Sequence, residues 1–206
     1  MTTKYGFSEV RDQLLKGMRG AYPTKLEDFQ SAKVLGEDVF GSPKPHPNAV
    51  LNLFEAQNVR FAVPFAAYRA SIGGFSSLVS ESPGTVLPRW TLASTIHGMH
   101  LLRSMAASTA RIVTHGVHLG VCPDKSSRCA LNVEINPMEE RKKVLERVHG
   151  SFVGEREGGL LTPPLLEHLL CARCAKPIVG VHALRGSDYW EVLPRVFGIS
   201  NSWDDL

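Results

Sequence analysis

The chain has 206 residues, of which 43% are hydrophobic and 21% charged, and its formal net charge is +3. This length allows one large domain or two small ones with a buried core, and so small a positive charge does not by itself indicate a nucleic-acid-binding protein. No apolar run approaches the roughly 20 residues that span a bilayer, and the charges near the N-terminus argue against a secretory signal peptide. We therefore expect a cytoplasmic or nuclear protein with reduced cysteines.

Apolar residues recur at helical spacing through the first part of the chain. Residues 5–19 predict an amphipathic helix, because apolar side chains recur every three to five residues with charges between them. A short second helix is predicted around residues 26–29, and a third after the proline-rich break "GSPKPHP" at residues 41–47. A fourth is predicted to begin near Pro64 and to end at Gly73.

The longest helical periodicity covers residues 90–119, and we expect it to break into two helices because ~10–14 residues is the usual helix length. Asn136 and Pro137 predict the start of a further helix, "NPMEERKKVLERV". Residues 117–122 and 176–184 are short β-capable runs, which predict a small hairpin near the cysteines. The expected fold is mainly α: an irregular helical bundle with a small β-hairpin or cysteine knuckle in the C-terminal third.

The four cysteines form two pairs, Cys122 with Cys129 and Cys171 with Cys174. A C-x-x-C turn lets both thiolates face one zinc ion, and two pairs supply the four tetrahedral ligands of a structural zinc site. The six-residue gap in the first pair is longer than in most zinc knuckles, and buried cysteine also packs as a small apolar residue. The sequence leaves both interpretations open: a structural zinc site on all four residues, or reduced thiols packed in a core.

Other cysteine chemistry is less consistent with the sequence. A thioredoxin-like redox site would require a C-x-x-C that follows a strand of a βαβ unit, and no such strand is predicted. An intramolecular disulfide would require an oxidising compartment. A metallohydrolase would require an open zinc position with a carboxylate beside it, and Asp124 is the acidic residue nearest in sequence to a cysteine.

Catalytic motifs are absent from the sequence. No G-x-S-x-G, H-E-x-x-H or phosphate-loop pattern occurs. The histidine pairs of the long predicted helix lie in a stretch with no acidic residue between Glu81 and Asp124, so no carboxylate is there to act as a base. Arg89, Arg103 and Arg111 in the same stretch suggest a basic stripe for an acidic partner, or simply a solvated helix face. We therefore expect a protein that is not an enzyme.

The C-terminal segment "GSDYWEVLPRVFGISNSWDDL" predicts a helix that begins at Ser187. Trp190, Leu193 and Phe197 recur at helical spacing in it, and Trp203 follows close to its end. Large aromatic side chains of this kind either fill a core or bind a partner. We expect the segment to dock back onto the helices of the same chain.

Several segments together resemble one known family. "TTKYGFSEVRDQLL" resembles the helical pair that closes a BTB/POZ domain. "YPTKLEDF", "AVLNLFEAQNVRFAVPFAAYRAS", the C-x-x-C pair and "YWEVLPRVFGISNSWDDL" are similar to successive landmarks of the BTB/POZ domain-containing family of mushroom-forming (basidiomycete) fungi. The matching positions are Pro64, Ala66, Ala67, Tyr68, Ser71, Trp190, Leu193, Pro194, Phe197, Gly198 and Trp203.

This resemblance implies a division into three parts. Residues 1–30 correspond to a helical pair like the end of a BTB domain, residues 31–120 to a BACK-like helical region, and residues 121–206 to a cysteine-containing region docked on the helices. BTB domains generally dimerise or bind cullin scaffolds. The BTB core that would precede "KYGF" is missing, which implies a truncated gene product or a paralogue without that core, so these binding surfaces do not carry over.

The resemblance implies a non-enzymatic protein–protein interaction module, such as an adaptor for a partner or a substrate. We expect no membrane partner, because the sequence has no long apolar run. The alternative is a helical module with a zinc knuckle that associates with nucleic acid or the transcription machinery. Retention on DNA that falls steeply with salt would favour the alternative.

Overall fold

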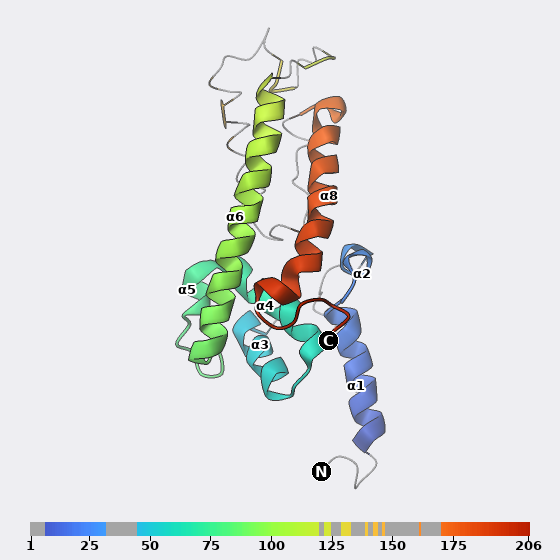
Figure 1. Ribbon diagram of the computed structural model, residues 1–206, viewed down its shortest axis with the longest axis vertical. Coiled ribbons are helices and arrows are strands. Elements are labelled where there is room, and N and C mark those ends of the chain that lie inside the picture. Colours follow the sequence, from blue (N-terminus) through green and yellow to red (C-terminus); the bar gives the residue numbers. More distant parts are fainter. Residues whose placement is uncertain are drawn as a thin grey trace. The chain divides into compact units, whose positions relative to one another are not determined.

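The fold is helical wherever the structure describes it. The structure is a computed structural model (Figure 1). It describes residues 7–31, 45–119, 122–124, 129–132, 139, 142–143, 146, 161 and 170–206. Within these residues it contains seven α-helices and one 3-10 helix, single helical positions at 139, 142–143, 146 and 161, and no strand, so the prediction of a mainly α fold is confirmed. No helix of the described part is long and apolar enough to cross a membrane.

The chain forms two compact units. One unit comprises Met1–Gly98 together with Glu191–Leu206, and the other comprises Met99–Trp190. The long helices α6 (Arg89–Leu119) and α8 (Ala172–Val196) contribute residues to both. The two units are called the first and the second unit below, and the three-part division at residues 30 and 120 stays a prediction.

The first unit is built around two helices that pack against each other, α3 (Pro47–Ala56) and α4 (Val63–Ile72). α3 begins where the His46 side chain accepts a hydrogen bond from the Asn48 backbone N–H, and a proline follows at the first helical position, where no donor is needed. The other elements of this unit that lie outside the long helices are α1 (Phe7–Ala21), α2 (Leu26–Ser31), the 3-10 helix η2 (Arg60–Ala62) and α5 (Gly74–Leu78).

Aromatic side chains fill the core of the first unit. Phe54 of α3 and Phe65 of α4 are fully buried. Tyr22, just after α1, meets Phe54 edge-on with ring centroids 4.6 Å apart, and Phe29 of α2 meets Phe65 at 5.5 Å. Such edge-to-face pairs contribute about 0.5–1.5 kcal/mol beyond the area that they bury. They therefore attach α1 and α2 to the α3–α4 pair.

A fully buried amide joins α3 to the segment after α5. The Asn48 Nδ2 group donates hydrogen bonds to the backbone carbonyl oxygens of Ser77, Leu78 and Thr85, at 3.0, 3.2 and 3.1 Å. One buried side chain thus provides hydrogen bonds to three backbone carbonyl oxygens that would otherwise need another donor.

We expect Asn48→Ala to lower the free energy of unfolding by about 1–3 kcal/mol, because it leaves buried carbonyl oxygens without a donor. Asn52→Ala is the matched control: the Asn52 amide also donates to two backbone carbonyls of the same loop, at Gly84 and Val86, but at the surface, where water replaces it. Denaturant unfolding of both variants measures the difference. Equal losses in the two variants would contradict this role of burial.

The buried phenol of Tyr22 makes the stability of the protein depend on pH in the alkaline range. Burial raises the pKa of Tyr22 to about 12, and the nearby Arg69 charge opposes the rise. Since the pKa is higher in the folded than in the unfolded state, this contribution to stability is complete below pH ~10 and is lost as the pH rises toward 12. We expect Tyr22→Phe to show a shallower alkaline loss of stability than the wild type, measured as melting temperature against pH. Parallel curves would contradict it.

The end of α8 and the residues after it belong to the first unit and close its core. Leu193 and Phe197 are buried, as the sequence predicts. Gly198 lies two residues after the end of α8 at Val196, and its φ of 68° places it in the left-handed region. The Ile199 N–H donates to the Pro194 carbonyl at 2.9 Å and the Gly198 N–H to that of Arg195 at 3.0 Å, which is a Schellman motif.

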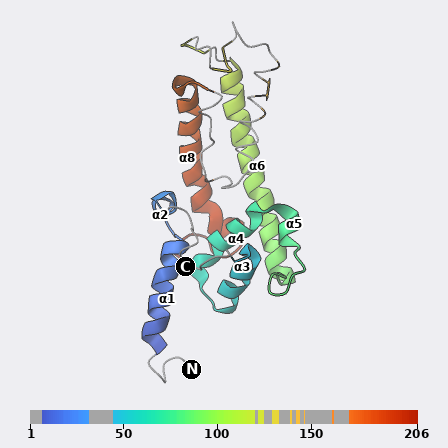
Figure 2. The same ribbon diagram turned by 180° about the vertical axis from the view of Figure 1, so that it is seen from behind.

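In the second unit, α6 and α8 lie side by side and run antiparallel, as both views show (Figure 1 and Figure 2). The Thr109 hydroxyl of α6 and the Tyr189 hydroxyl of α8 form a buried hydrogen bond of 2.6 Å. Buried residues recur every three or four positions along this part of α6: Leu102, Ala106, Ala110 and Val113. This stripe gives α6 a continuous apolar side to pack against α8.

Three expectations about these long helices are wrong. α6 does not break but continues over Arg89–Leu119. Residues 176–184 form no hairpin strand, because they lie within α8. Ser187 does not begin a helix, since α8 already begins at Ala172. In each case burial along one helix side outweighs local signals for a break, a strand or a cap. The helix predicted from Pro137 falls mostly outside the described residues.

Candidate metal centre

The four cysteines come from three places in the second unit. Cys122 lies shortly after α6, and Cys129 opens a turn in which its carbonyl accepts the Asn132 N–H at 2.9 Å. Cys171 immediately precedes α8, and its carbonyl accepts the N–H groups of Cys174 and Ala175 at 3.0 and 2.9 Å. The C-x-x-C segment therefore forms the first turn of α8. This turn holds both of its cysteines at the same end of the helix.

The four sulfur atoms converge on one point. All four Sγ atoms lie within 4.8 Å of one another, although Cys122 and Cys171 are 49 positions apart in the sequence. The Cys122 and Cys171 Sγ atoms are 3.7 Å apart. A disulfide would require about 2.05 Å, and none of the four cysteines forms a disulfide. In contrast, a tetrahedron with metal–sulfur bonds of ~2.3 Å has sulfur–sulfur edges of ~3.8 Å, so the observed spacing fits such a site.

The cluster lies in the apolar core of the second unit. Cys122 and Cys129 are buried, and Cys171 and Cys174 are partly buried. The buried apolar residues around the sulfurs are Ala110, Val113, Leu131, Leu170 and Ile178. This environment excludes water from most of the site, which protects a metal–thiolate centre from competing ligands.

Burial also governs the protonation of the thiols. It raises the pKa of Cys129, chiefly through desolvation of the thiolate. The pKa of Cys174 is raised in the same way, and the neighbouring cysteines raise it further. Without a cation these groups therefore remain neutral thiols at neutral pH. A divalent metal ion would displace the protons and supply the charge that a cluster of thiolates requires.

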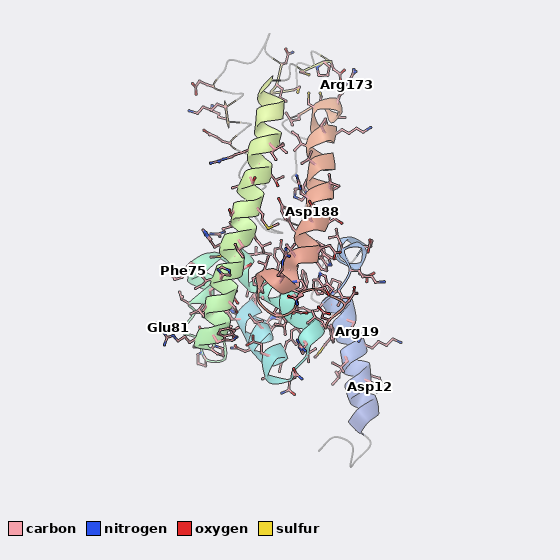
Figure 3. All side chains as sticks on the ribbon, in the orientation of Figure 1. Asp12, Arg19, Phe75, Glu81, Arg173 and Asp188 are labelled. Carbon is pink, nitrogen blue, oxygen red and sulfur yellow. The ribbon has the colours of Figure 1, made fainter. Side chains whose placement is uncertain are left out.

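A surface ion pair lies next to the cluster. The Arg173 guanidinium, between the two cysteines of the C-x-x-C segment, forms an ion pair with Asp124 at 3.0 Å. Figure 3 labels Arg173 at the end of α8 where the helix begins. The Cys171 Sγ lies 4.0 Å from the other carboxylate oxygen of Asp124. Cys171 is thus the cysteine that the structure connects to polar groups at the surface.

The structure brings together every cysteine that the sequence singles out. It does not bring in the histidines: His97 and His100 are exposed, and the side chains of His115, His118 and His168 lie outside the described residues. The Asp124–Arg173 pair and the apolar residues around the sulfurs are not predicted from the sequence. The position of Arg173 within C-A-R-C was the one available signal, since its charge lies next to two sulfurs in any fold.

The donor set is complete without any other residue. Four cysteine thiolates fill a tetrahedral zinc site and leave no open position for a substrate or a water molecule. Asp124 is held by Arg173 rather than placed as a free base. This arrangement suits a structural site better than the metallohydrolase alternative.

Searches of protein-family models, of characterised proteins and of solved structures find no match to this chain.

Proposed function

We propose that this protein is a non-enzymatic helical module that binds a protein partner, and that a structural zinc ion on Cys122, Cys129, Cys171 and Cys174 holds its second unit together. The observation that supports this most is the convergence of the four sulfurs, with one pair at the spacing of a tetrahedral edge. A closed tetrathiolate site contributes to folding and not to turnover.

The zinc ion would act on the connection between distant segments. Cys122 and Cys129 lie in the stretch after α6, whereas Cys171 and Cys174 lie at the start of α8. These thiolates would fix the far end of the α6–α8 pair, opposite the Thr109–Tyr189 hydrogen bond. The ion thereby substitutes for the regular structure that the described turns at residues 122–124 and 129–132 do not contain.

The role in binding a protein rests on exposed apolar residues and on the resemblance to the region that follows the BTB core in fungal proteins. Trp90, at the start of α6, is 78% exposed, and Phe75 of the same unit is 59% exposed. Tryptophan is among the residues that most often contribute strongly to protein–protein binding. An exposed tryptophan on a helical scaffold can therefore serve as a contact residue for a partner. In a protein related to the fungal BTB family, that partner would be a target protein or a substrate.

Association with nucleic acid is the competing proposal, and one observation favours it. Arg89, Arg103 and Arg111 are exposed on α6, a helix without acidic residues. If these arginines contact phosphates, the binding constant for DNA would fall as the salt concentration rises, and more steeply the more phosphates are contacted.

Affinity capture with the full chain distinguishes the protein-binding proposal from the nucleic-acid-binding proposal. Trp90→Ala is the test variant. Leu14→Ala is the control, because Leu14 is another exposed apolar residue. We expect a defined protein partner to be retained at physiological salt by the wild type and the control and lost with Trp90→Ala. Retention on duplex DNA with a steep salt dependence, unaffected by Trp90→Ala, would contradict the protein-binding proposal. The metal part is tested separately: elemental analysis is expected to give one zinc per chain.

A further inference from the structure

Of the four clustered cysteines, Cys171 is the one whose sulfur lies beside a charged group at the surface, the carboxylate of Asp124. We propose that Cys171 is the residue at which hydroperoxides attack this centre, and that Cys122 resolves the product into a Cys122–Cys171 disulfide with release of the metal. The proposal rests on the metal centre proposed above, and it names a modification site and its chemical reagent.

The choice of Cys171 follows from its surroundings. Cys122 and Cys129 are buried, with 2% and 0% of their surface exposed, so an oxidant in solution does not reach them directly. Cys171 is partly exposed, and its sulfur lies 4.0 Å from the carboxylate of Asp124, which is itself exposed. The ion pair of Asp124 with Arg173 thus gives the surroundings of Cys171 polar hydrogen-bonding groups, which a small polar molecule such as hydrogen peroxide can contact. Cys174 is partly exposed as well, but among the described residues it is the sulfur of Cys171, and not that of Cys174, that lies beside the Asp124 carboxylate.

The choice of Cys122 follows from distance. Its sulfur is 3.7 Å from that of Cys171, so the two atoms have to approach by less than 2 Å to reach the disulfide length of ~2.05 Å. A disulfide between Cys171 and Cys174 would instead close within the first turn of α8, where the Cys174 and Ala175 N–H groups both bond to the Cys171 carbonyl. The pairing across the cluster leaves that turn intact.

The reaction proceeds in two steps. In the first, the Cys171 thiolate attacks one oxygen of the peroxide: the S–O bond forms, the O–O bond breaks, and the departing hydroxide takes up a proton to become water. In the second, the Cys122 thiolate attacks the sulfur of this sulfenic acid: the S–S bond forms, the S–O bond breaks, and a second water leaves after protonation. The two sulfurs lose two electrons in total and the peroxide gains them, while the oxidation state of the metal does not change.

Oxidation would also change how the second unit is held together. Only Cys129 and Cys174 remain as thiolates after the disulfide forms, and two ligands are too few to hold the ion in competition with water and other chelators. The covalent bond keeps residue 122 at the start of α8, whereas the turn that begins at Cys129 loses its attachment. The modified protein would therefore keep one of the links between the two segments and lose another.

Peptide mapping of the full chain tests this directly, because trypsin places each cysteine on a different peptide. Cleavage after arginine and lysine gives residues 112–125, 129–141, 157–173 and 174–185, with Arg173 separating Cys171 from Cys174. The zinc-loaded protein is treated with limiting hydrogen peroxide, and released zinc is followed with a chromogenic chelator. We expect the first disulfide to join peptides 112–125 and 157–173, with one zinc released per disulfide formed.

Two variants provide the matched comparison, since each leaves three thiolates in the cluster. In Cys122→Ser the resolving thiol is absent, and we expect sulfenic acid to accumulate at Cys171, where dimedone labels it several-fold more than in Cys129→Ser. In Cys129→Ser the disulfide between Cys122 and Cys171 is expected to form as in the wild type. A first disulfide between any other pair, or equal dimedone labelling in the two variants, would overturn the proposal.

The failure of this inference and that of the proposed function give different results. A protein that purifies with zinc but forms a different first disulfide contradicts the inference alone. A protein that purifies without any metal contradicts the metal centre. In that case, the first disulfide that peroxide forms in the reduced, metal-free protein shows whether the positions of the sulfurs alone select Cys122 and Cys171.

Discussion

Chelation of the metal ion proposed on the four cysteines is expected to unfold the second unit. Structural zinc contributes on the order of 10 kcal/mol at neutral pH, which is comparable with the total stability of a domain, about 5–15 kcal/mol. All four ligands lie between Met99 and Trp190. Hydrogen exchange measured on the chelator-treated protein is therefore expected to show lost protection at residues 171–190, with greater retention in α3 and α4.

Cys129→Ser supplies the control for this experiment, because it removes one fully buried ligand and changes the side chain by a single atom. The variant keeps three thiolates and holds the ion more weakly, so its melting temperature is expected to lie below that of the wild type, and chelator is expected to lower it by less than it lowers that of the wild type. If the wild type melts at the same temperature with and without chelator, the four thiols are simply packed in the core, which is the alternative that the sequence left open.

The second large effect is expected at Gly98, where α6 meets the end of the chain within the first unit. A methyl group at this position would overlap the ring of Phe197, and that ring is buried with 2% of its surface exposed. A buried ring can give way only by displacing its neighbours, so we expect Gly98→Ala to lower the free energy of unfolding by about 1–3 kcal/mol. Denaturant unfolding measures the change.

Gly180→Ala is the matched control, since Gly180 lies within a long helix and nothing is found within 4 Å of a methyl group added there. Alanine favours a helix over glycine by about 0.8–1.0 kcal/mol, so the control is expected to gain stability. Phe197→Leu in the Gly98→Ala background is expected to recover part of the loss. A Gly98→Ala protein as stable as the wild type would show that the tail does not pack against α6 in this way.

Helical periodicity predicted the fold class correctly, and it also predicted the buried anchors Leu193 and Phe197. The predictions from the sequence were wrong in two places, where a local feature of the sequence favoured another structure than the one that buries the apolar side chains. Residues 176–184 are rich in β-branched side chains, but Ile178 and His182, one helical turn apart, are both buried, so the helix is preferred. The expected break in α6 was based on helix length alone, and the buried stripe along the helix removes the reason for it.

The sequence indicated which residues could bind a metal ion, but it did not indicate how they are arranged in space. The spacing of Cys171 and Cys174 indicated two ligands for one ion, and nothing in the sequence showed that Cys122 would lie 3.7 Å from Cys171. Hydrogen bonds between segments that are distant in the sequence cannot be predicted either, because the sequence does not show which segments come together. Asn48 bonds to backbone carbonyls 29 to 37 residues later, and carbonyls carry no sequence signal.

X-ray absorption at the zinc edge of the purified full-length protein tests the central claim most directly, because it reports the identity and distance of the ligands around the ion. The account predicts one zinc per chain with four sulfur neighbours at about 2.3 Å. Nitrogen or oxygen atoms in the first coordination sphere, or a protein that contains no zinc after growth with zinc, would contradict it.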